Sequence, residues 1–291
     1  MAFFVTSVYN RSTIVSGSDD GLSRDILSRP ALRADFRLNY GPEQYQFGDL
    51  YLPVGPGPHP VVIGIHGGFW RAAYALDYYG HLCRALAETG IAAWNIEYRR
   101  IGNRGGGWPG TFLDVAQAAD YLREIAATYN LDLLRLVSLG HSSGGHLAFW
   151  LGARPKITSG DPLFSASPIP LKGLVSLAGV VDLRRAYELQ LGGGVTKELL
   201  GGSPSEVPKR YHSGSPFELL PLGVTQVLIH GTDDMNVPYE IATRYHAAAQ
   251  SRGDPVSLVS LHRAGHFECV DPNTREWSAV QAAVAQAIAS T

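Results

Sequence analysis

The sequence predicts an α/β protein with a mostly parallel central sheet and helices on both faces. Three observations lead to this fold class. Short runs rich in Val, Ile and Leu recur along residues 61–290, and most are followed by a longer stretch with helical spacing. The first run, VVIGIH at 61–66, is apolar on both faces, as in a strand that is covered on both sides. Glycine-rich turns follow several runs, and such strand–helix alternation favours parallel strands joined by helical crossovers.

The elements can be placed in order along the chain. Residues 1–33 are polar and poorly periodic, so we expect an N-terminal arm with a short helix around Gly21–Ser28. An early strand is expected near 45–52, closed by the turn-rich PVGPGPHP at 53–60. The later strands are expected at 61–66, 91–97, 134–139, 173–178, 225–230 and 256–261. The helices are expected at 75–89, 111–129, 143–153, 239–251 and 274–290.

The length and composition favour one large domain. The chain has 291 residues, of which 45% are hydrophobic and 17% charged, so disorder is excluded as its main description. We see no internal repeat and no linker that divides it, and we therefore expect a single domain over residues 34–291. Residues 184–222 are rich in Gly, Pro and Ser and interrupt the alternation, which predicts a cap-like excursion there.

The charge, hydropathy and cysteine content limit the classes of partner and the cellular location that we expect. A net charge of −2 argues against a nucleic-acid-binding protein, which usually carries a basic excess. No run reaches 18 apolar residues and the first residues do not resemble a secretory signal, so we expect no membrane span and a cytoplasmic location. The two cysteines, Cys83 and Cys269, are too few for a disulfide scaffold, and no metal-ligand pattern appears. A homodimer is compatible with the sequence, with the arm and the C-terminal helix as candidate contacts.

The first motif that carries chemistry is Gly140-His141-Ser142-Ser143-Gly144, which matches G-x-S-x-G. It follows the predicted strand at 134–139 and opens a predicted helix, as a nucleophile elbow requires. The tight turn needs small residues two positions before and after Ser142, and glycine stands at both. Such a turn places the Ser142 hydroxyl above the carboxyl ends of the strands, where open α/β sheets bind ligands.

A serine nucleophile needs a base, and the base needs an acid that orients it. His266, in AGHFE after the last predicted strand, is the expected general base. Three acids are candidates: Asp234 fits best, its neighbour Asp233 follows the same strand, and Asp182 follows the strand before it. Each candidate lies just beyond the carboxyl end of a predicted strand, on the same edge of the sheet as Ser142.

The third motif is the HGGFW sequence at 66–70. Acyl transfer creates an oxyanion that preorganised backbone N–H groups stabilise. Glycines at 67 and 68 allow the backbone to approach a substrate closely. We expect the amides of Gly68, Phe69 and Ser143 to form the oxyanion hole, and His66 to orient the loop.

Together these motifs resemble the α/β-hydrolase superfamily over about residues 40–290. HGGFW, GHSSG, GTDDMNVP and AGHFE occur in the order that this superfamily uses. HGGFW is most similar to the loop of kynurenine formamidase-like and small carboxylesterase members. The resemblance implies a Ser–Asp–His triad at Ser142, Asp234 and His266, an acyl-enzyme intermediate and no cofactor. Phe69 departs from the HGGG of other members, which leaves open which amides form the oxyanion hole.

Aromatic residues surround the expected site. Trp70, Trp108, His141 and Phe267 are the expected substrate-binding residues, with Phe69 and Tyr74 nearby in sequence. An aromatic pocket suits small aryl or short-acyl substrates. The function predicted is therefore a serine hydrolase of small carboxylic esters or amides. Kynurenine formamidase is the specific alternative, and a non-catalytic binding protein of the same fold is the second alternative.

Overall fold

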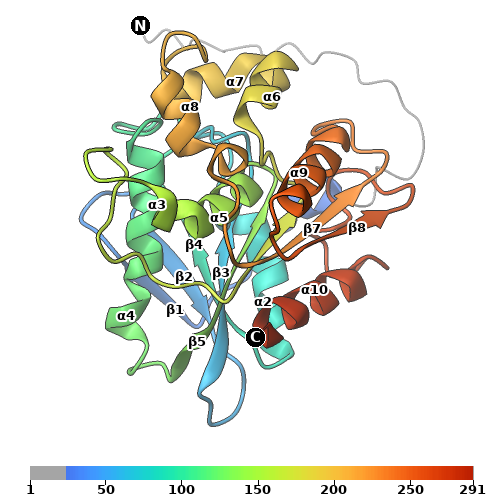
Figure 1. Cartoon of the computed structure of the whole chain (residues 1–291). Coiled ribbons are helices and arrows are strands. Elements are labelled where there is room, and N and C mark those ends of the chain that lie inside the picture. Colours follow the sequence, from blue (N-terminus) through green and yellow to red (C-terminus); the bar gives the residue numbers. More distant parts are fainter. Residues whose placement is uncertain (1–23, 291) are drawn as a thin grey trace, which may run out of the picture.

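The computed structural model describes residues 24–290 and is built on one eight-stranded sheet in the order β1-β2-β4-β3-β5-β6-β7-β8 (Figure 1). β2 runs antiparallel to both of its neighbours, and the strands from β4 to β8 pair in parallel. This confirms the predicted α/β-hydrolase type of sheet. The strands are β1 (Phe36–Asn39), β2 (Phe47–Tyr51), β3 (His59–Ile65), β4 (Ala92–Ile96), β5 (Leu131–His141), β6 (Gly173–Leu177), β7 (Thr225–Gly231) and β8 (Val256–Leu261).

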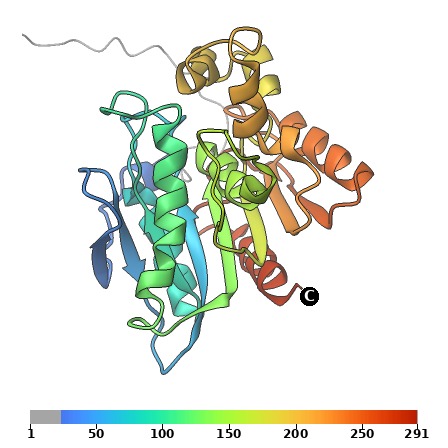
Figure 2. The same cartoon turned by 60° about the vertical axis from the view of Figure 1, so that its left-hand side comes forward.

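Helices cover both faces of the sheet, which Figures 1 and 2 show from two directions. Helices α2 and α10 pack on one face, and helices α3, α5 and α9 pack on the other. The α-helices are α2 (Gly80–Glu88), α3 (Gly110–Asp120), α4 (Leu122–Ile125), α5 (Ser143–Ala153), α6 (Leu183–Glu188), α7 (Leu191–Leu200), α8 (Pro208–Gly214), α9 (Glu240–Ser251) and α10 (Trp277–Ala289). Short 3₁₀ turns are η1 (Arg24–Leu27), η2 (Leu76–Tyr79), η3 (Arg154–Lys156) and η4 (Pro216–Leu219).

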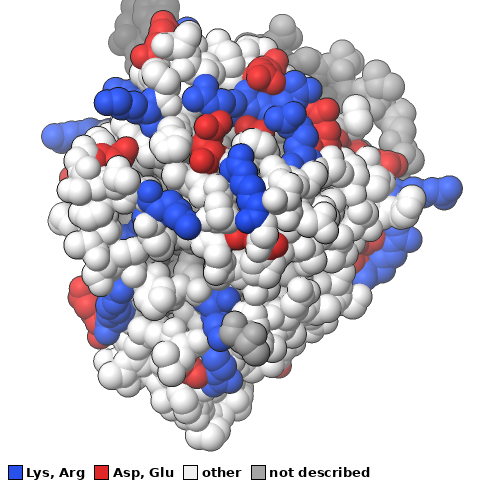
Figure 3. Space-filling view, viewed as in Figure 1, with Lys and Arg blue, Asp and Glu red and all other residues white. Residues whose placement is uncertain are grey.

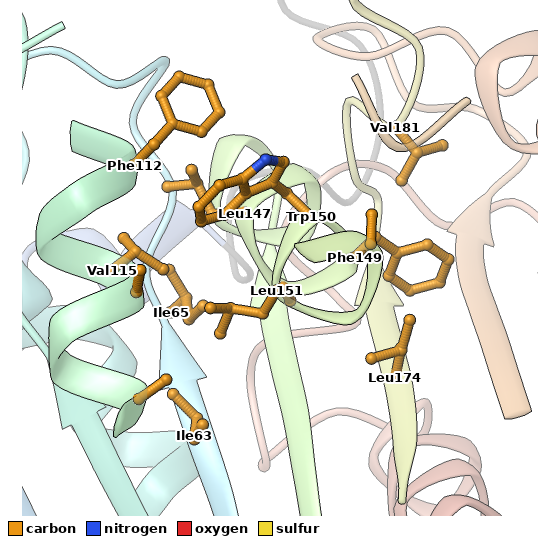
Figure 4. Close-up of a cluster of buried hydrophobic side chains, with 14 of the residues drawn as sticks. Ile63, Ile65, Phe112, Val115, Leu147, Phe149, Trp150, Leu151, Leu174 and Val181 are labelled. Carbon is orange, nitrogen blue, oxygen red and sulfur yellow. The ribbon is translucent and has the colours of Figure 1, made fainter. Parts of the chain in front are cut away.

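The core consists of two hydrophobic clusters separated by the sheet. Successive side chains of a strand point to opposite faces, so Val62 joins the α2–α10 cluster while Ile63 and Ile65 join the other. Figure 4 shows this second cluster, in which β3 and α3 side chains meet Trp150 and other residues of α5. Because both of their faces are buried, inner strands such as β3 and β4 carry continuous apolar runs rather than alternating ones.

The structure differs from the sequence prediction in one strand and two helices. β1 was not predicted, because its burial is low and Phe36 is exposed, as is typical of an edge strand. The helix expected at 75–89 begins as the 3₁₀ turn η2, and the one expected at 111–129 is divided into α3 and α4 and ends at Ile125. Residues 184–222 hold α6, α7, α8 and η4, so this glycine-rich segment is largely helical; α7 begins in left-handed glycines.

Loops at the carboxyl ends of β3, β5, β7 and β8 meet at one end of the sheet, and Figure 1 shows α6, α7 and α8 above it. In a parallel sheet all such ends lie on the same side. Segments far apart in sequence therefore come together there. The predicted arm is described only from residue 24 onward; the expected helix around Gly21–Ser28 lies partly outside the described residues, and η1 occupies its second half.

Candidate active site

Ser142 lies at a sharp turn between β5 and α5. Its backbone is in an unusual conformation, with φ 56° and ψ −121°, as expected for a nucleophile elbow. A side chain at Gly140 would overlap the carbonyl oxygen of Gly144, and one at Gly144 would overlap that of Ile65. The Ser142 amide donates to the Leu177 carbonyl at 2.8 Å. The two glycines and this bond together fix the turn.

His266 and Asp234 form a short hydrogen bond, with 2.7 Å between Nδ1 and Oδ2. A carboxylate can only accept, so His266 Nδ1 carries the proton. In a neutral imidazole Nε2 then carries the lone pair and can accept a proton. The other oxygen of Asp234 accepts the amides of Asn236 and Val237 at 2.8 and 2.9 Å. These two bonds fix the carboxylate, and thereby the orientation of the imidazole.

The surroundings of Asp234 keep it ionised. Burial alone would raise the pKa of Asp234, but the neighbouring imidazoles of His266 and His230 outweigh burial and hold that pKa well below its usual value. His230 Nε2 lies 3.2 Å from the carboxylate and donates to the Val237 carbonyl at 2.8 Å. A carboxylate that remains charged holds the neutral imidazole of His266 in the tautomer with the proton on Nδ1.

Ser142 and His266 line the same small cavity, which has a volume of about 60 Å³. Aromatic side chains form much of its wall, as is common in small-molecule sites. Its walls come from the arm, the loops after β3, β7 and β8, and the turn after β5. The lining residues are Leu27, Gly68, Phe69, Tyr74, Tyr78, His141, Ser142, Asn236, His266 and Phe267.

Of the three candidate acids, Asp234 is the one that contacts the base. Asp233 is exposed, and its carboxylate accepts a hydrogen bond from a neighbouring threonine. Asp182 caps α6, accepting the Arg185 amide at 3.0 Å, and lies 3.5 Å from the Arg244 guanidinium. The geometry therefore favours Asp234 as the acid, whereas Asp182 serves as the cap of α6.

The loop after β3 brings backbone amides to the cavity. Gly68 has a φ of 115°, and Phe69 and Trp70 have φ of 53° and 56°, so three successive residues adopt left-handed backbone. Gly68 and Phe69 line the cavity. The Trp70 amide donates instead to Ser143 Oγ at 3.2 Å. Gly68 and Phe69, two of the candidate oxyanion residues, thus lie beside the cavity, while the hydroxyl of Ser143 holds the end of the loop.

A hydrogen-bond chain connects this loop to the segment that carries His266. The Gly67 amide donates to Tyr78 Oη at 2.7 Å, and Tyr78 Oη lies 2.9 Å from His141 Nδ1. His141 Nε2 donates to the His266 carbonyl at 2.9 Å. Because that carbonyl only accepts, Nδ1 is the acceptor and Tyr78 donates to it. Burial, followed by the nearby charge of His266, lowers the pKa of His141 to about 3, so His141 stays neutral.

A second buried pair, His66 and Glu97, supports the loop after β3. His66 Nε2 lies 3.0 Å from the Glu97 carboxylate, and His66 Nδ1 lies 2.8 Å from the Gly67 carbonyl. Burial would raise the pKa of Glu97, but His66 and then Arg100 outweigh it and lower that pKa. These contacts agree with the expectation that His66 orients the loop.

The structure separates the predicted pocket aromatics into two groups. Phe69, Tyr74 and Phe267 line the cavity, as does His141. Trp70 is 1% exposed and belongs to the core, so it does not face the cavity. Trp108 is half-buried and packs edge-on against a phenylalanine of α3, outside the lining of the cavity. The expectation that these two tryptophans contact substrate has no support in this geometry.

Three lining residues were not singled out from the sequence. Asn236 lies two positions after Asp234, and the spacing of that turn could have indicated it. Tyr78 stands in η2, where it was assigned only to a helix. Leu27 belongs to the arm, and nothing in the local sequence indicates that the arm reaches the site.

Other classes of site receive no support from the described residues. Across residues 24–290 no group of three or more His, Cys, Asp or Glu side chains is arranged to hold a metal ion. Within the same range no helix is long and apolar enough to cross a membrane. On the face shown in Figure 3, Lys and Arg are interspersed with Asp and Glu rather than gathered in one broad basic surface.

Comparison with known sequences identifies the family. The BD-FAE family model matches residues 49–248. A probable isoprenylcysteine alpha-carbonyl methylesterase from Oryza sativa subsp. japonica is 30% identical over 263 residues, which cover 84% of this chain and 59% of the relative. The chain thus spans little more than half the length of that relative.

Comparison with solved structures supports the fold. A truncated carbohydrate esterase from gut microbiota superposes with a TM-score of 0.76 at 24% identity, covering 89% of this chain and 99% of that one. A butyrate-bound thermophilic esterase from Thermogutta terrifontis gives a TM-score of 0.67 at 21% identity, covering 87% and 91%. With the family match over residues 49–248, the chain belongs to the BD-FAE family, an esterase family with the α/β-hydrolase fold.

Proposed function

We propose that this protein is a serine esterase that hydrolyses small carboxylic esters through an acyl-enzyme on Ser142. The observation that carries the proposal is the His266–Asp234 hydrogen bond of 2.7 Å beside a strained Ser142 in one small cavity. The family match and the esterases among the relatives support ester hydrolysis ahead of the formamidase activity that the HGGFW loop suggested. A complete set of catalytic groups favours an enzyme over a binding protein.

The proposed first half-reaction follows from the protonation states. Nε2 of His266 takes the proton of Ser142 Oγ as Oγ attacks the carbonyl carbon of the ester. The carbonyl oxygen becomes an oxyanion, which the amides of Gly68, Phe69 and Ser143 stabilise. The imidazolium, held by ionised Asp234, then gives its proton to the departing alcohol oxygen.

The second half-reaction regenerates the enzyme. A water molecule gives a proton to Nε2 of His266 and attacks the acyl carbon on Ser142. The oxyanion forms again against the same amides. Collapse of this intermediate releases the carboxylic acid and returns the proton to Ser142 Oγ.

The size of the cavity supports a small acyl group. The cavity is small, with a volume of about 60 Å³. Phe69 and Phe267 give it apolar walls, which suit an acetyl to butyryl chain.

The test is the kcat/KM of wild type and Ser142→Ala on p-nitrophenyl acetate. We expect a loss of at least about 10⁴-fold, because the nucleophile is removed. Ser251→Ala, on the exposed side of α9, is the matched control and keeps wild-type activity. Folded Ser142→Ala with activity within a few fold of wild type would overturn the proposal. N-Formylkynurenine assayed in parallel separates esterase from formamidase.

A further inference from the structure

The segment before β1 lies against the cavity that holds Ser142. Ile26 is completely buried and belongs to the same hydrophobic cluster as Tyr78. Phe267 also packs against this cluster. Its neighbour Leu27 lines the cavity and is 40% exposed. One residue of η1 therefore anchors the arm, and the next forms part of the cavity wall.

A partly buried ion pair holds this segment in place. Arg29 Nη1 and Nη2 donate to the two carboxylate oxygens of Asp271 at 2.8 and 2.6 Å. Such a bidentate pair is stronger and more directional than a single contact. The Asp271 side chain is 3% exposed, and Asp271 follows His266 by five residues in the same loop. Burial would raise the pKa of Asp271, but the Arg29 guanidinium outweighs it and lowers that pKa.

The position of Leu27 relative to a bound ester follows from the proposed chemistry. The carbonyl oxygen must lie against Gly68 and Phe69, and the carbonyl carbon must lie beside Ser142. The acyl chain then lies along the walls of this small cavity, which has a volume of about 60 Å³. Leu27 is the apolar wall that comes from outside the catalytic loops.

We propose that Leu27 is a specificity-determining residue that limits the length of the acyl chain, and that the Arg29–Asp271 pair holds it against the cavity. The inference rests on the proposed esterase function and adds the N-terminal arm to the substrate-binding site. The substrates it favours are acetyl to butyryl esters over hexanoyl and longer ones.

The experiment compares kcat/KM for p-nitrophenyl acetate, butyrate, hexanoate and octanoate. Leu27→Ala removes three side-chain carbons from the wall, and a few methylene groups change discrimination by about tenfold or more. We expect the hexanoate-to-acetate ratio of kcat/KM to rise roughly tenfold. Leu32→Ala is the matched control, since Leu32 lies in the same arm with 39% exposure and does not line the cavity. Its ratio stays at the wild-type value.

A second variant tests the clamp without altering the wall itself. Arg29→Met keeps the length of the side chain and removes both hydrogen bonds to Asp271. We expect the ratio to rise in the same direction as for Leu27→Ala, and Arg29→Lys to restore part of the wild-type preference. Thermal unfolding of each variant verifies that the fold is intact.

The outcomes separate the two proposals. Hydrolysis that depends on Ser142, with an unchanged chain-length profile in Leu27→Ala and Arg29→Met, would overturn this inference alone. Absence of any hydrolysis that depends on Ser142 would overturn the esterase proposal and this inference with it. A raised ratio in both variants, with Leu32→Ala unchanged, supports the inference.

Discussion

Replacement of Asp234 by Asn tests how the proposed acid acts. Its Oδ1 accepts the amides of Asn236 and Val237, so the oxygen of an asparagine must stay on that side. The new NH₂ group then faces His266 Nδ1 and donates to it. The His266 proton moves to Nε2, the atom that should accept the Ser142 proton, and the base is lost. The NH₂ group also faces the N–H of His230. In the wild-type protein, His230 Nε2 lies 3.2 Å from Asp234 Oδ2.

The size of the effect follows from this change of tautomer. The same change in a serine protease lowers kcat about 10⁴-fold while the geometry is retained. We expect a loss of about 10⁴-fold here, which corresponds to about 5 kcal/mol in the activation free energy.

The assay is kcat for p-nitrophenyl acetate at pH 8, with thermal unfolding as a control for folding. Asp233→Asn is the matched variant, because the neighbouring carboxylate is exposed and does not contact His266. It should retain activity within about twofold. Asp234→Asn with kcat within tenfold of wild type would refute the tautomer argument, and a large loss in Asp182→Asn instead would assign the acid to Asp182.

Three further predictions follow from buried hydrogen bonds and close packing. Tyr78→Phe removes the hydroxyl between Gly67 and His141, so kcat on p-nitrophenyl acetate should fall by about 10- to 100-fold with little change in KM; an effect no larger than that of Tyr79→Phe would contradict this. Burial lowers the pKa of His146 to about 4, so this imidazole is neutral in the fold and stability is lost as pH falls from 6.5 toward 4. By pH 5 the loss is about 2 kcal/mol, and urea unfolding of His146→Gln should show a smaller decrease between pH 7 and 5; an equal decrease would count against it. Gly140→Ala would place a methyl group in the elbow and should abolish activity or yield insoluble protein, so soluble and active protein would show that the turn can relax.

The parts of the fold that the sequence predicted share one property. They are segments whose apolar pattern follows directly from burial, such as the continuous run VVIGIH at 61–66, which is covered on two faces. β1 escaped prediction because an exposed edge strand carries little hydrophobic pattern, and Phe36 is its large apolar residue on the surface. Helix α7 was not predicted because the glycines at 192–194 mask the helical pattern of the residues that follow.

The residues of the candidate site likewise divide into those that the sequence predicts and those that it does not. Ser142, Asp234 and His266 could be proposed because each lies at a predictable point beyond a strand end, and the structure places them at one end of the sheet. Trp108 looked suited to contact substrate because it stands in a glycine-rich loop, but local sequence does not report the direction of a side chain. Leu27 could not be predicted, since its place depends on a tertiary contact, Arg29 with Asp271, that spans 242 positions.

We infer that Ser142 carries the acyl group, and mass spectrometry of peptides from the rapidly quenched protein tests this. The protein is mixed with excess p-nitrophenyl acetate, quenched in acid within milliseconds and digested for peptide mapping. We predict an added acetyl group on the peptide that contains Ser142, formed in a burst and absent in Ser142→Ala. An acetyl group on another residue that turns over at the steady-state rate, with Ser142 unmodified, would contradict the claim.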